Sequence, residues 1–561
     1  MEFLNCILKI LKYFVMTAVT VLTGVFPYGF SVSESRADFE IKLNERSGTA
    51  SNIMSNVNCW NMGTSFIGAE PNGKYNVFDF VEYVQLMQCS GGNEYRDLFL
   101  DPDDRSVLDD YDFERLIGNC EGIISLGAKP HLKLGSVPEK YTTGPERGEF
   151  DTNRLPPDDY DVYYDYIFAL ANALVENFGK DEVLTWRFGV MTEFENESWF
   201  KARSGDPDES REAYCKLYDY TVQALIDAVG PDVFVGAHAM AVTDGLWKEE
   251  DFIEHVACGT NYKTGKTGTK ICFLSASFYD NHIGSYTSGN TLEKTIGHLR
   301  ECAKKYGLND LIYGVDEGRI LCGTVSGSIG NQLLSRTTGY TWQAAYDARL
   351  WKKCIDNNID YFSSWSFLTG GLIQGYPTVS YHVAKNISAF GGSEKVKVKK
   401  NVFKAADFGV EIDSCAVYNP ETQTLRIMAY NYKNSLELDK KAKLSFKVDA
   451  SQFGLSKVIV KKTFINDDCN FFDEWCKDRK TYGITDDCFG WSPEDPWIED
   501  RNTLSDDRAV SIYETELKEK YEECAQSRTI KQVIEISDGE LLIKDTIDPN
   551  SVVFYEINLG K

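Results

Sequence analysis

The sequence of 561 residues is poor in histidine, and it lacks the short motifs that bind metals or dinucleotides. It contains 6 histidines, no C-x-x-C pair and no H-E-x-x-H segment, which argues against a zinc site. No G-x-G-x-x-G follows the first predicted strand, which argues against a dinucleotide site. We therefore expect neither a metal nor an organic cofactor.

Positive charge is also scarce. Lysine and arginine number 59 against 85 aspartates and glutamates, which gives a formal net charge of −26. Because phosphate binding requires clustered cations, this composition argues against nucleic acid and against an anionic membrane surface as partners. The hydrophobic content of 43% excludes a disordered chain. The aromatic content of 13% fits large cores or a cleft in which rings stack on sugars.

The N-terminus lacks an apolar run long enough for an ordinary membrane span. Lys9 and Lys12 precede an apolar run at 13–26, and small or polar residues follow at 31–37. This order is typical of a secretory signal peptide, whereas a membrane span needs about 20 residues. We expect 1–37 to be a signal peptide or an uncleaved signal anchor. The protein would then be secreted or on the cell surface, with no stable membrane partner beyond that anchor.

The 15 cysteines form no metal-binding spacing. Without Cys6 their number is even, which fits a disulfide-bonded protein and equally a large enzyme with free thiols. Most lie singly in apolar patterns and are expected to be buried thiols. Disulfides are expected in one loop-rich stretch, which contains Cys469, Cys476, Cys488 and Cys524.

Short apolar runs alternate with amphipathic segments over most of the first 392 residues. Eight strands are predicted at 53–60, 95–100, 129–134, 186–191, 233–237, 271–278, 311–315 and 361–367. Eight strands with helices between them predict a (β/α)8 TIM barrel over residues 38–392. An open doubly wound sheet is the alternative.

The pattern changes after Gly392. Short strands with polar turns predict an antiparallel β-sandwich domain over residues 393–561. An acidic, aromatic-rich insertion at about 466–528 interrupts it, and a helix is expected near 511–524.

Two glutamates follow predicted barrel strands. Glu193 comes after the fourth strand and Glu317 after the seventh, and a barrel places its active groups at these carboxyl ends. Hydrolysis of a glycosidic bond needs two carboxyl groups, and a spacing of about 5–5.5 Å leads to retention of configuration. The pair therefore predicts a glycosidase site.

The segment 186–200 resembles the motif W-x-F-E-V-W-N-E-P-N-L-x-x-F-W of glycoside hydrolase family 39, the β-xylosidase and α-L-iduronidase family. Trp186, Phe188, Val190 and Glu193 match in place. The resemblance implies a catalytic barrel, a retaining mechanism and an accessory β-sandwich. It also implies that Glu193 is the acid/base. Glu197 is the alternative acid, but the register set by the matching residues favours Glu193.

Further segments extend the resemblance over about residues 110–480. The segment 127–138 resembles the family's G-x-K-P-x-x-E-L-x-F-M-P, and 470–475 resembles N-A-Y-x-x-W. Residues 275–279 resemble S-x-H-x-Y on the sixth strand. Glu317 falls where the family has the nucleophile of T-E-W.

This chain departs from the family at several site positions. Thr192 replaces the asparagine that binds the sugar 2-hydroxyl, and Ser277 replaces the histidine of S-x-H-x-Y. Asp316 precedes Glu317, and strand alternation predicts that it points away from the barrel axis. These changes suggest an altered substrate preference and leave open a relative without catalytic activity.

The remaining candidates concern substrate binding. Tyr279 is expected to hydrogen-bond the nucleophile, and Trp365 to form the floor of the sugar site; packing is the alternative for both. His131 and His238 lie within strands and are candidates for substrate contact or for the core.

The sequence thus favours a secreted retaining glycoside hydrolase that acts on plant or host polysaccharide or oligosaccharide. A non-catalytic carbohydrate-binding protein on the same scaffold is the alternative. A structural protein of the cell surface is a third, weaker hypothesis.

Overall fold

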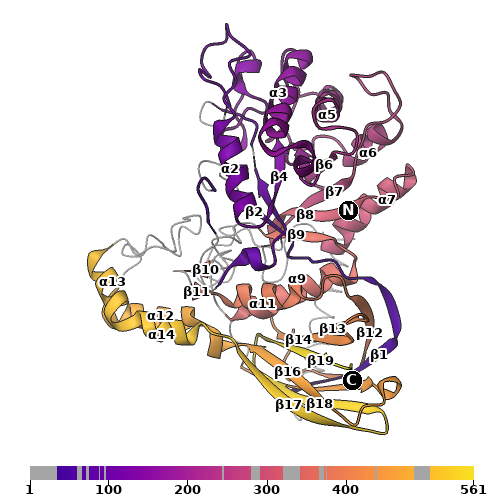
Figure 1. The fold of residues 1–561 in the computed structure, drawn as a ribbon, viewed down its shortest axis with the longest axis vertical. Helices are drawn as coiled ribbons and strands as arrows, with labels where there is room; N and C mark the ends of the chain where they lie inside the picture. Colours follow the sequence, from indigo (N-terminus) through magenta and orange to yellow (C-terminus); the bar gives the residue numbers. More distant parts are fainter. Residues whose placement is uncertain are drawn as a thin grey trace, which may run out of the picture.

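The computed structural model describes two β-rich units, with helices α9 (Trp342–Asp356) and α11 (Val379–Ser388) between them (Figure 1). The described residues are 34–59, 66–70, 75–87, 89–93, 97–242, 245–279, 291–319, 341–364, 372–373, 376–435, 439–484 and 506–560. The Arg349 guanidinium of α9 lies 2.8 Å from the Glu411 carboxylate of β13 (Glu411–Asn419) in the second unit. The units are therefore packed against each other rather than joined by an open linker.

The first unit is an eight-stranded parallel sheet in the order β2 to β9. Its strands are β2 (Asn56–Cys59), β3 (Tyr83–Leu86), β4 (Lys129–Leu134), β5 (Arg187–Val190), β6 (Phe234–Met240), β7 (Phe273–Tyr279), β8 (Ile312–Arg319) and β9 (Tyr361–Ser364). The Phe362 N–H of β9 donates to the Ile53 carbonyl just before β2, at 2.8 Å. The sheet is thus nearly closed, which confirms the predicted barrel-like arrangement.

One predicted strand is wrong. The second strand is β3 at Tyr83–Leu86, and not residues 95–100. Phe99 instead forms an isolated bridge with Tyr111, and its ring stacks on Tyr166 at 5.4 Å between centroids. Leu98 and Phe99 are buried although they lie in a loop, and this gave the loop the apolar composition of a strand.

Helices cover the outside of the barrel. They are α2 (Glu114–Ser125), α3 (Tyr160–Phe178), α4 (Lys180–Val183), α5 (Pro207–Val229), α6 (Glu249–Cys258), α7 (Leu292–Lys305), α9 (Trp342–Asp356) and α11 (Val379–Ser388). The Asp159 side chain caps α3, and Gly179 ends it at φ 82°. Asp206 caps α5, Pro207 begins it and Gly230 ends it. These signals explain why the predicted helices are found.

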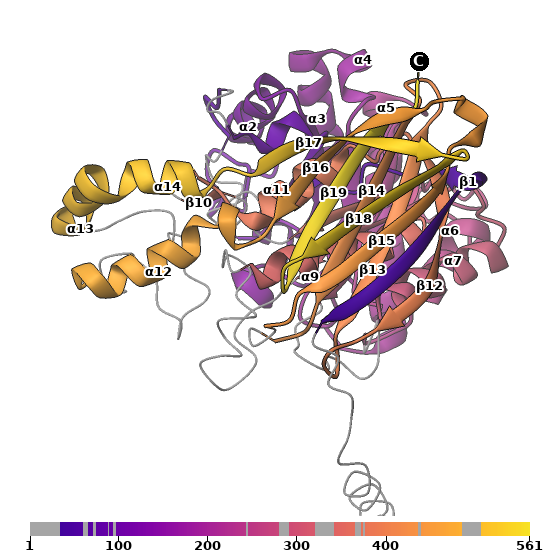
Figure 2. The same ribbon diagram turned by 90° about the horizontal axis from the view of Figure 1, so that it is seen from below.

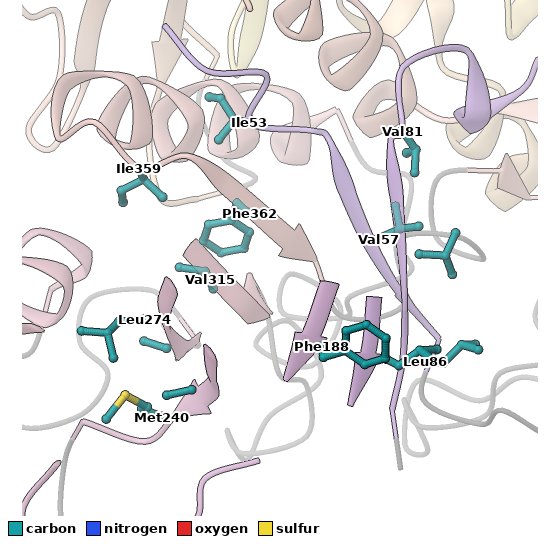
Figure 3. Close-up of a cluster of buried hydrophobic side chains, with 14 of the residues drawn as sticks. Ile53, Val57, Val81, Leu86, Phe188, Met240, Leu274, Val315, Ile359 and Phe362 are labelled. Carbon is teal, nitrogen blue, oxygen red and sulfur yellow. The ribbon is translucent and has the colours of Figure 1, made fainter. Parts of the chain in front are cut away.

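The barrel core lies between the strands and the helices. Leu86, Phe188, Leu274, Val315 and Phe362 are buried apolar residues on this outer face of the strands (Figure 3). Their neighbours along the strands face the barrel axis and are mostly polar. Among the described residues, none of the helices has the length and apolar character that a bilayer crossing requires.

The second unit is one sheet that closes on itself, where two stacked sheets were expected. Its strands are β1 (Ser35–Thr49), β12 (Glu394–Lys404), β13 (Glu411–Asn419), β14 (Thr424–Tyr432), β15 (Ala442–Asp449), β16 (Lys457–Ile465), β17 (Arg528–Ser537), β18 (Glu540–Ile547) and β19 (Ser551–Asn558). All neighbours are antiparallel except β1 and β15, which are parallel.

Strand β1 corrects the predicted domain boundaries. It pairs with β12 and β15, so residues 38–49 belong to the second unit and not to the barrel. Ser35–Ala37, assigned above to the signal segment, also lie in this strand. Alternate residues such as Phe39 are buried, and the Phe39 ring stacks on Phe446 at 5.2 Å between centroids. The rest of the predicted signal segment, 1–33, lies outside the described residues.

The predicted insertion forms a helical arm beside the second unit (Figure 2). It contains α12 (Phe471–Tyr482), α13 (Asp507–Ile512), a π-helical turn at Tyr513–Leu517 and α14 (Lys518–Cys524). Phe471, Tyr513 and Tyr521 pack with Tyr376, which lies in the short hairpin of β10 (Leu372–Ile373) and β11 (Tyr376–Pro377). Cys469 and Cys524 are free thiols, so neither forms the disulfide expected in this region.

Candidate active site

The carboxyl ends of β5, β6 and β8 contain unusual backbone conformations. Non-glycine residues with positive φ gather there: Met191 at 59°, Glu193 at 42°, Ala239 at 44°, Val242 at 51° and Arg319 at 86°. Such conformations cost free energy, and they cluster at functional sites where surrounding structure maintains them. This end of the barrel is where both predicted carboxyl groups lie.

Glu193 is held by its backbone and by its carboxyl group. Its N–H donates to the Ala239 carbonyl at 2.9 Å, and Trp199 Nε1 donates to its Oε2 at 2.9 Å. The Ser277 hydroxyl donates to the same Ala239 carbonyl at 3.4 Å, and it lies near enough to the Glu193 carboxyl to affect the pKa of that group. Burial raises the pKa of Glu193, whereas Ser277 and Trp199 lower it in part. The net upward shift suits a group that must carry a proton at mild pH.

Glu317 reaches the barrel mouth because β8 contains a bulge. Val315 pairs with Ala276 and Glu317 pairs with Ser277, so Asp316 is an extra residue opposite one step of β7. Glu317 is 6% exposed, and its Oε1 accepts a hydrogen bond from the Tyr279 hydroxyl at 2.5 Å. Glu317 and Ser277 therefore lie on the same face of neighbouring strands.

Ser277 lies between the segments that carry the two glutamates. It is the register partner of Glu317, and its hydroxyl donates at 3.4 Å to the Ala239 carbonyl that also accepts from the Glu193 N–H. Glu193 and Glu317 are 124 positions apart in the sequence, yet both lie at the carboxyl end of the barrel. Their action as a catalytic pair stays a prediction.

The other predicted site residues differ in their placement. Thr192 is buried, and its hydroxyl has no hydrogen-bond partner among the described residues. Tyr279 is half-buried and contacts Glu317, as expected. Glu197, the alternative acid, is exposed in the loop beyond Glu193. Trp365 lies outside the described residues.

His131 and His238 lie within the barrel interior and not at its mouth. Both side chains are fully buried, and the ring centroids are 5.4 Å apart in an edge-on arrangement. This burial fits the alternative of core residues, and substrate contact stays a prediction for both. Each occupies an inward position on its strand, where desolvation lowers its pKa well below the usual value.

Asp316 completes this interior cluster. Contrary to the prediction from strand alternation, it points inward, and it offers a third potential metal ligand beside His131 and His238. Its oxygens already accept hydrogen bonds from the Gln85 amide at 2.6 Å and from the Ser275 hydroxyl. Arg187 adds a positive charge beside it. Because the carboxylate is occupied and a cation is near, these residues fit a hydrogen-bond network and not a metal site.

Three neighbours of the site had no role in the sequence analysis. Trp199 orients Glu193, and its only signal was its place in the family motif. Lys133 is buried with its Nζ 5.5 Å from the Trp199 ring centroid, at the position where the family motif quoted above has glutamate. Gln85 lies in β3, which the sequence analysis did not predict, because it assigned the second strand to residues 95–100.

A parallel barrel with two carboxyl groups at the carboxyl ends of its strands is the arrangement of glycoside hydrolases. Comparison with protein families is consistent with this class, since the model described as glycosyl hydrolases family 39 matches residues 97–487. This match covers more than half of the sequence. The chain belongs to glycosyl hydrolases family 39.

Individual relatives are more distant. A β-xylosidase of Caldicellulosiruptor saccharolyticus is 29% identical over 188 residues, which are 33% of this chain and 35% of that enzyme. The alignment thus spans about a third of that relative's length. A monomeric β-xylosidase of Caulobacter crescentus has the same fold, with a TM-score of 0.60 at 16% identity over 93% of this chain and 99% of that one. A family 39 enzyme of Xanthomonas axonopodis has a TM-score of 0.62 at 13% identity, over 95% of this chain and 99% of that one.

Proposed function

We propose that this protein is a retaining glycoside hydrolase, with Glu193 as the acid/base and Glu317 as the nucleophile. The observation that carries the proposal is the position of Ser277, which is the register partner of Glu317 and whose hydroxyl shares the Ala239 carbonyl as an acceptor with the Glu193 N–H. Membership of the family supports the reaction class. The substrate is a polysaccharide or oligosaccharide, and no metal or organic cofactor enters the reaction.

The two glutamates have different surroundings, as the two roles require. Burial raises the pKa of Glu193, so its carboxyl can hold the proton that the leaving oxygen needs. Glu317 attacks the anomeric carbon, and the Tyr279 hydroxyl holds its carboxylate in place. A covalent glycosyl-enzyme forms, and Glu193 then takes a proton from the water that hydrolyses it.

Retention of configuration is the stereochemical outcome that we propose. It requires a spacing of about 5–5.5 Å between the two carboxyl groups, whereas inverting enzymes have roughly 6.5–9.5 Å, which makes room for a water. A short spacing is supported by Ser277, which is the register partner of Glu317 and shares the Ala239 carbonyl as an acceptor with the Glu193 N–H.

β-Xylosides are the first substrates to test, because the relatives reported above are β-xylosidases. The buried Thr192 hydroxyl has no partner among the described residues and is available to a sugar hydroxyl. The non-catalytic alternative rests on the replacements at Thr192 and Ser277. It is not favoured, because the chain belongs to a glycoside hydrolase family and its relatives include β-xylosidases.

The test is a panel of aryl glycosides that includes an aryl β-xyloside, assayed with the wild-type protein, Glu317→Ala and Glu193→Gln. Hydrolysis by the wild type, loss of turnover in Glu317→Ala and a product that keeps its anomeric configuration by NMR are expected. If the protein bound an oligosaccharide but hydrolysed none of the substrates, the result would instead favour the non-catalytic carbohydrate-binding protein. An inverted product would refute the retaining mechanism.

We also propose that the protein is exported by the part of residues 1–37 that precedes β1, as a secreted or cell-surface enzyme. Expression of the full chain in a secreting host, followed by N-terminal sequencing of protein from the medium, tests this. A chain that stays in the cytosol with residues 1–37 intact would refute it.

A further inference from the structure

Asp316 occupies the bulge that aims the proposed nucleophile. Two consecutive residues of β8, Asp316 and Glu317, both lie on the inner side of the strand, because the register with β7 shifts between Ala276 and Ser277. In a regular strand, neighbouring side chains point to opposite faces. Without the extra residue, Glu317 would therefore point outward to the helices while Asp316 pointed inward.

The Asp316 carboxylate is bound from three other strands. Its Oδ1 accepts from Gln85 Nε2 of β3 at 2.6 Å. Its Oδ2 accepts from the Ala239 N–H of β6 at 3.3 Å and from the Ser275 hydroxyl of β7. Asp316 is fully buried, so no water competes for these donors. The carboxylate thus fixes the bulge of β8 against the opposite side of the barrel.

One of these donors belongs to the residue that holds the proposed acid. In β6, Ala237 pairs with Leu274 and Met240 pairs with Ala276, which leaves an extra residue in this strand as well. Ala239 lies in that irregularity at φ 44°. Its N–H donates to the Ser275 hydroxyl oxygen at 2.9 Å and to Asp316 Oδ2 at 3.3 Å, and its carbonyl accepts from the Glu193 N–H at 2.9 Å. Asp316 and Glu193 are therefore connected through a single residue.

We propose that Asp316 is a positioning residue that sets the geometry of both glutamates, Glu317 through the bulge of β8 and Glu193 through Ala239. The inference rests on the roles proposed above for these two glutamates. It adds a residue that touches no substrate and that replaces the threonine of the family's T-E-W motif. Such a residue acts on the chemical step, since a displacement of about 1 Å can cost about 100-fold in rate.

The ionised form of Asp316 is the one that accepts these hydrogen bonds. Burial raises the pKa of Asp316 to about 6, while the Ser275 hydroxyl and the Ala239 N–H lower it in part. The titratable and charged groups around it are His131 of β4, His238 of β6, Arg187 of β5, Tyr361 of β9 and Lys133 of β4. Desolvation keeps both histidines neutral. Protonation of Asp316 below about pH 6 should therefore loosen the site and lower kcat.

The experiment compares Asp316→Asn with Asp219→Asn. Asp219 is an equally buried carboxylate of α5, and it accepts from the Tyr262 N–H at 2.7 Å and from the Thr269 hydroxyl, away from the barrel mouth. In Asp316→Asn, an amide N–H₂ replaces one acceptor. We expect kcat on an aryl glycoside to fall about 10–100-fold with KM within about 2-fold. The acid limb of kcat near pH 6 should disappear. Asp219→Asn should be less stable than the wild type, with an unchanged kcat and an unchanged decrease of kcat near pH 6.

A second variant keeps the test decisive if Asp316→Asn does not fold. Ser275→Ala removes one hydrogen bond that lowers the pKa of Asp316, so the acid limb should move to higher pH. The inference would be overturned if kcat of Ser275→Ala decreased at the same acidic pH as kcat of the wild type. It would also be overturned if Asp316→Asn kept the kcat and the pH profile of the wild type. An equal loss of kcat in Asp219→Asn would overturn it as well. Failure of the proposed function is distinguishable, because Glu193→Gln and Glu317→Ala would then retain full activity.

Discussion

Replacing Glu195 with glutamine tests whether the fold holds this carboxyl group in its protonated form. Glu195 lies two residues beyond the proposed acid and is fully buried. Its Oε1 accepts from the Val242 N–H at 3.0 Å, and its Oε2 has no partner among the described residues. Burial, with smaller effects of the Glu249 and Glu193 charges, raises the pKa of Glu195 to about 8. At neutral pH the side chain is therefore mostly a neutral acid.

The size and sign of the effect follow from proton linkage. The folded protein binds this proton more tightly than the unfolded chain, where glutamate titrates near pH 4.5. The stability that protonation contributes is complete below about pH 4.5 and is lost as the pH rises to about 8. Each pH unit in this window costs about 1.4 kcal/mol, or about 3 kcal/mol between pH 5 and pH 7.5. Glutamine cannot ionise and keeps the acceptor for Val242.

Thermal unfolding at pH 5, 6.5 and 7.5 measures this effect. Relative to wild type, Glu195→Gln should gain about 3 kcal/mol of unfolding free energy from the lowest to the highest pH. The unfolding entropy is about 2.1 cal/mol/K per residue, so this free energy raises the melting temperature of a barrel of roughly 340 residues by about 4 °C relative to wild type. Glu197→Gln, at an exposed position two residues away, is the matched control and should show a constant difference. Parallel pH curves for wild type and Glu195→Gln would refute the reasoning.

Three further outcomes are expected. Glu193→Gln should spare aryl glycosides with good leaving groups and lose about 10²–10⁴-fold on poor ones, because only these need protonation; the same dependence in Glu197→Gln alone would show that the register is wrong. Tyr279→Phe removes the hydrogen bond to Glu317 and should lower kcat/KM about 10–100-fold with an unchanged circular dichroism spectrum, since a hydrogen bond to a charged group contributes about 1.5–3 kcal/mol. Phe39→Ala should cost about 3–5 kcal/mol and lower the melting of the second unit only. Calorimetry that showed destabilisation of the barrel instead would contradict the place of β1.

The sequence predicted the features that depend on local patterns. Apolar runs of strand length identified seven of the eight barrel strands, and the glycines Gly179 and Gly230 end the helices α3 and α5 between them. The register of Trp186, Phe188 and Val190 selected Glu193, which the structure places at the barrel mouth. Local signals sufficed there because strand ends, helix caps and motif spacing are each encoded within a few neighbouring residues.

Tertiary structure decided the features that depend on which distant segments pair. The alternating pattern of β1 is compatible with either sheet, so the sequence does not show which unit the strand belongs to. Its pairing with β12 and β15 places it in the second unit. Strand alternation predicts that the Asp316 side chain points outward. In the structure, the pairing of β8 with β7 contains a bulge at this residue, and the side chain points inward. The raised pKa of Glu195 also came from the fold, because burial by other elements, and not the residue itself, sets the cost of its charge.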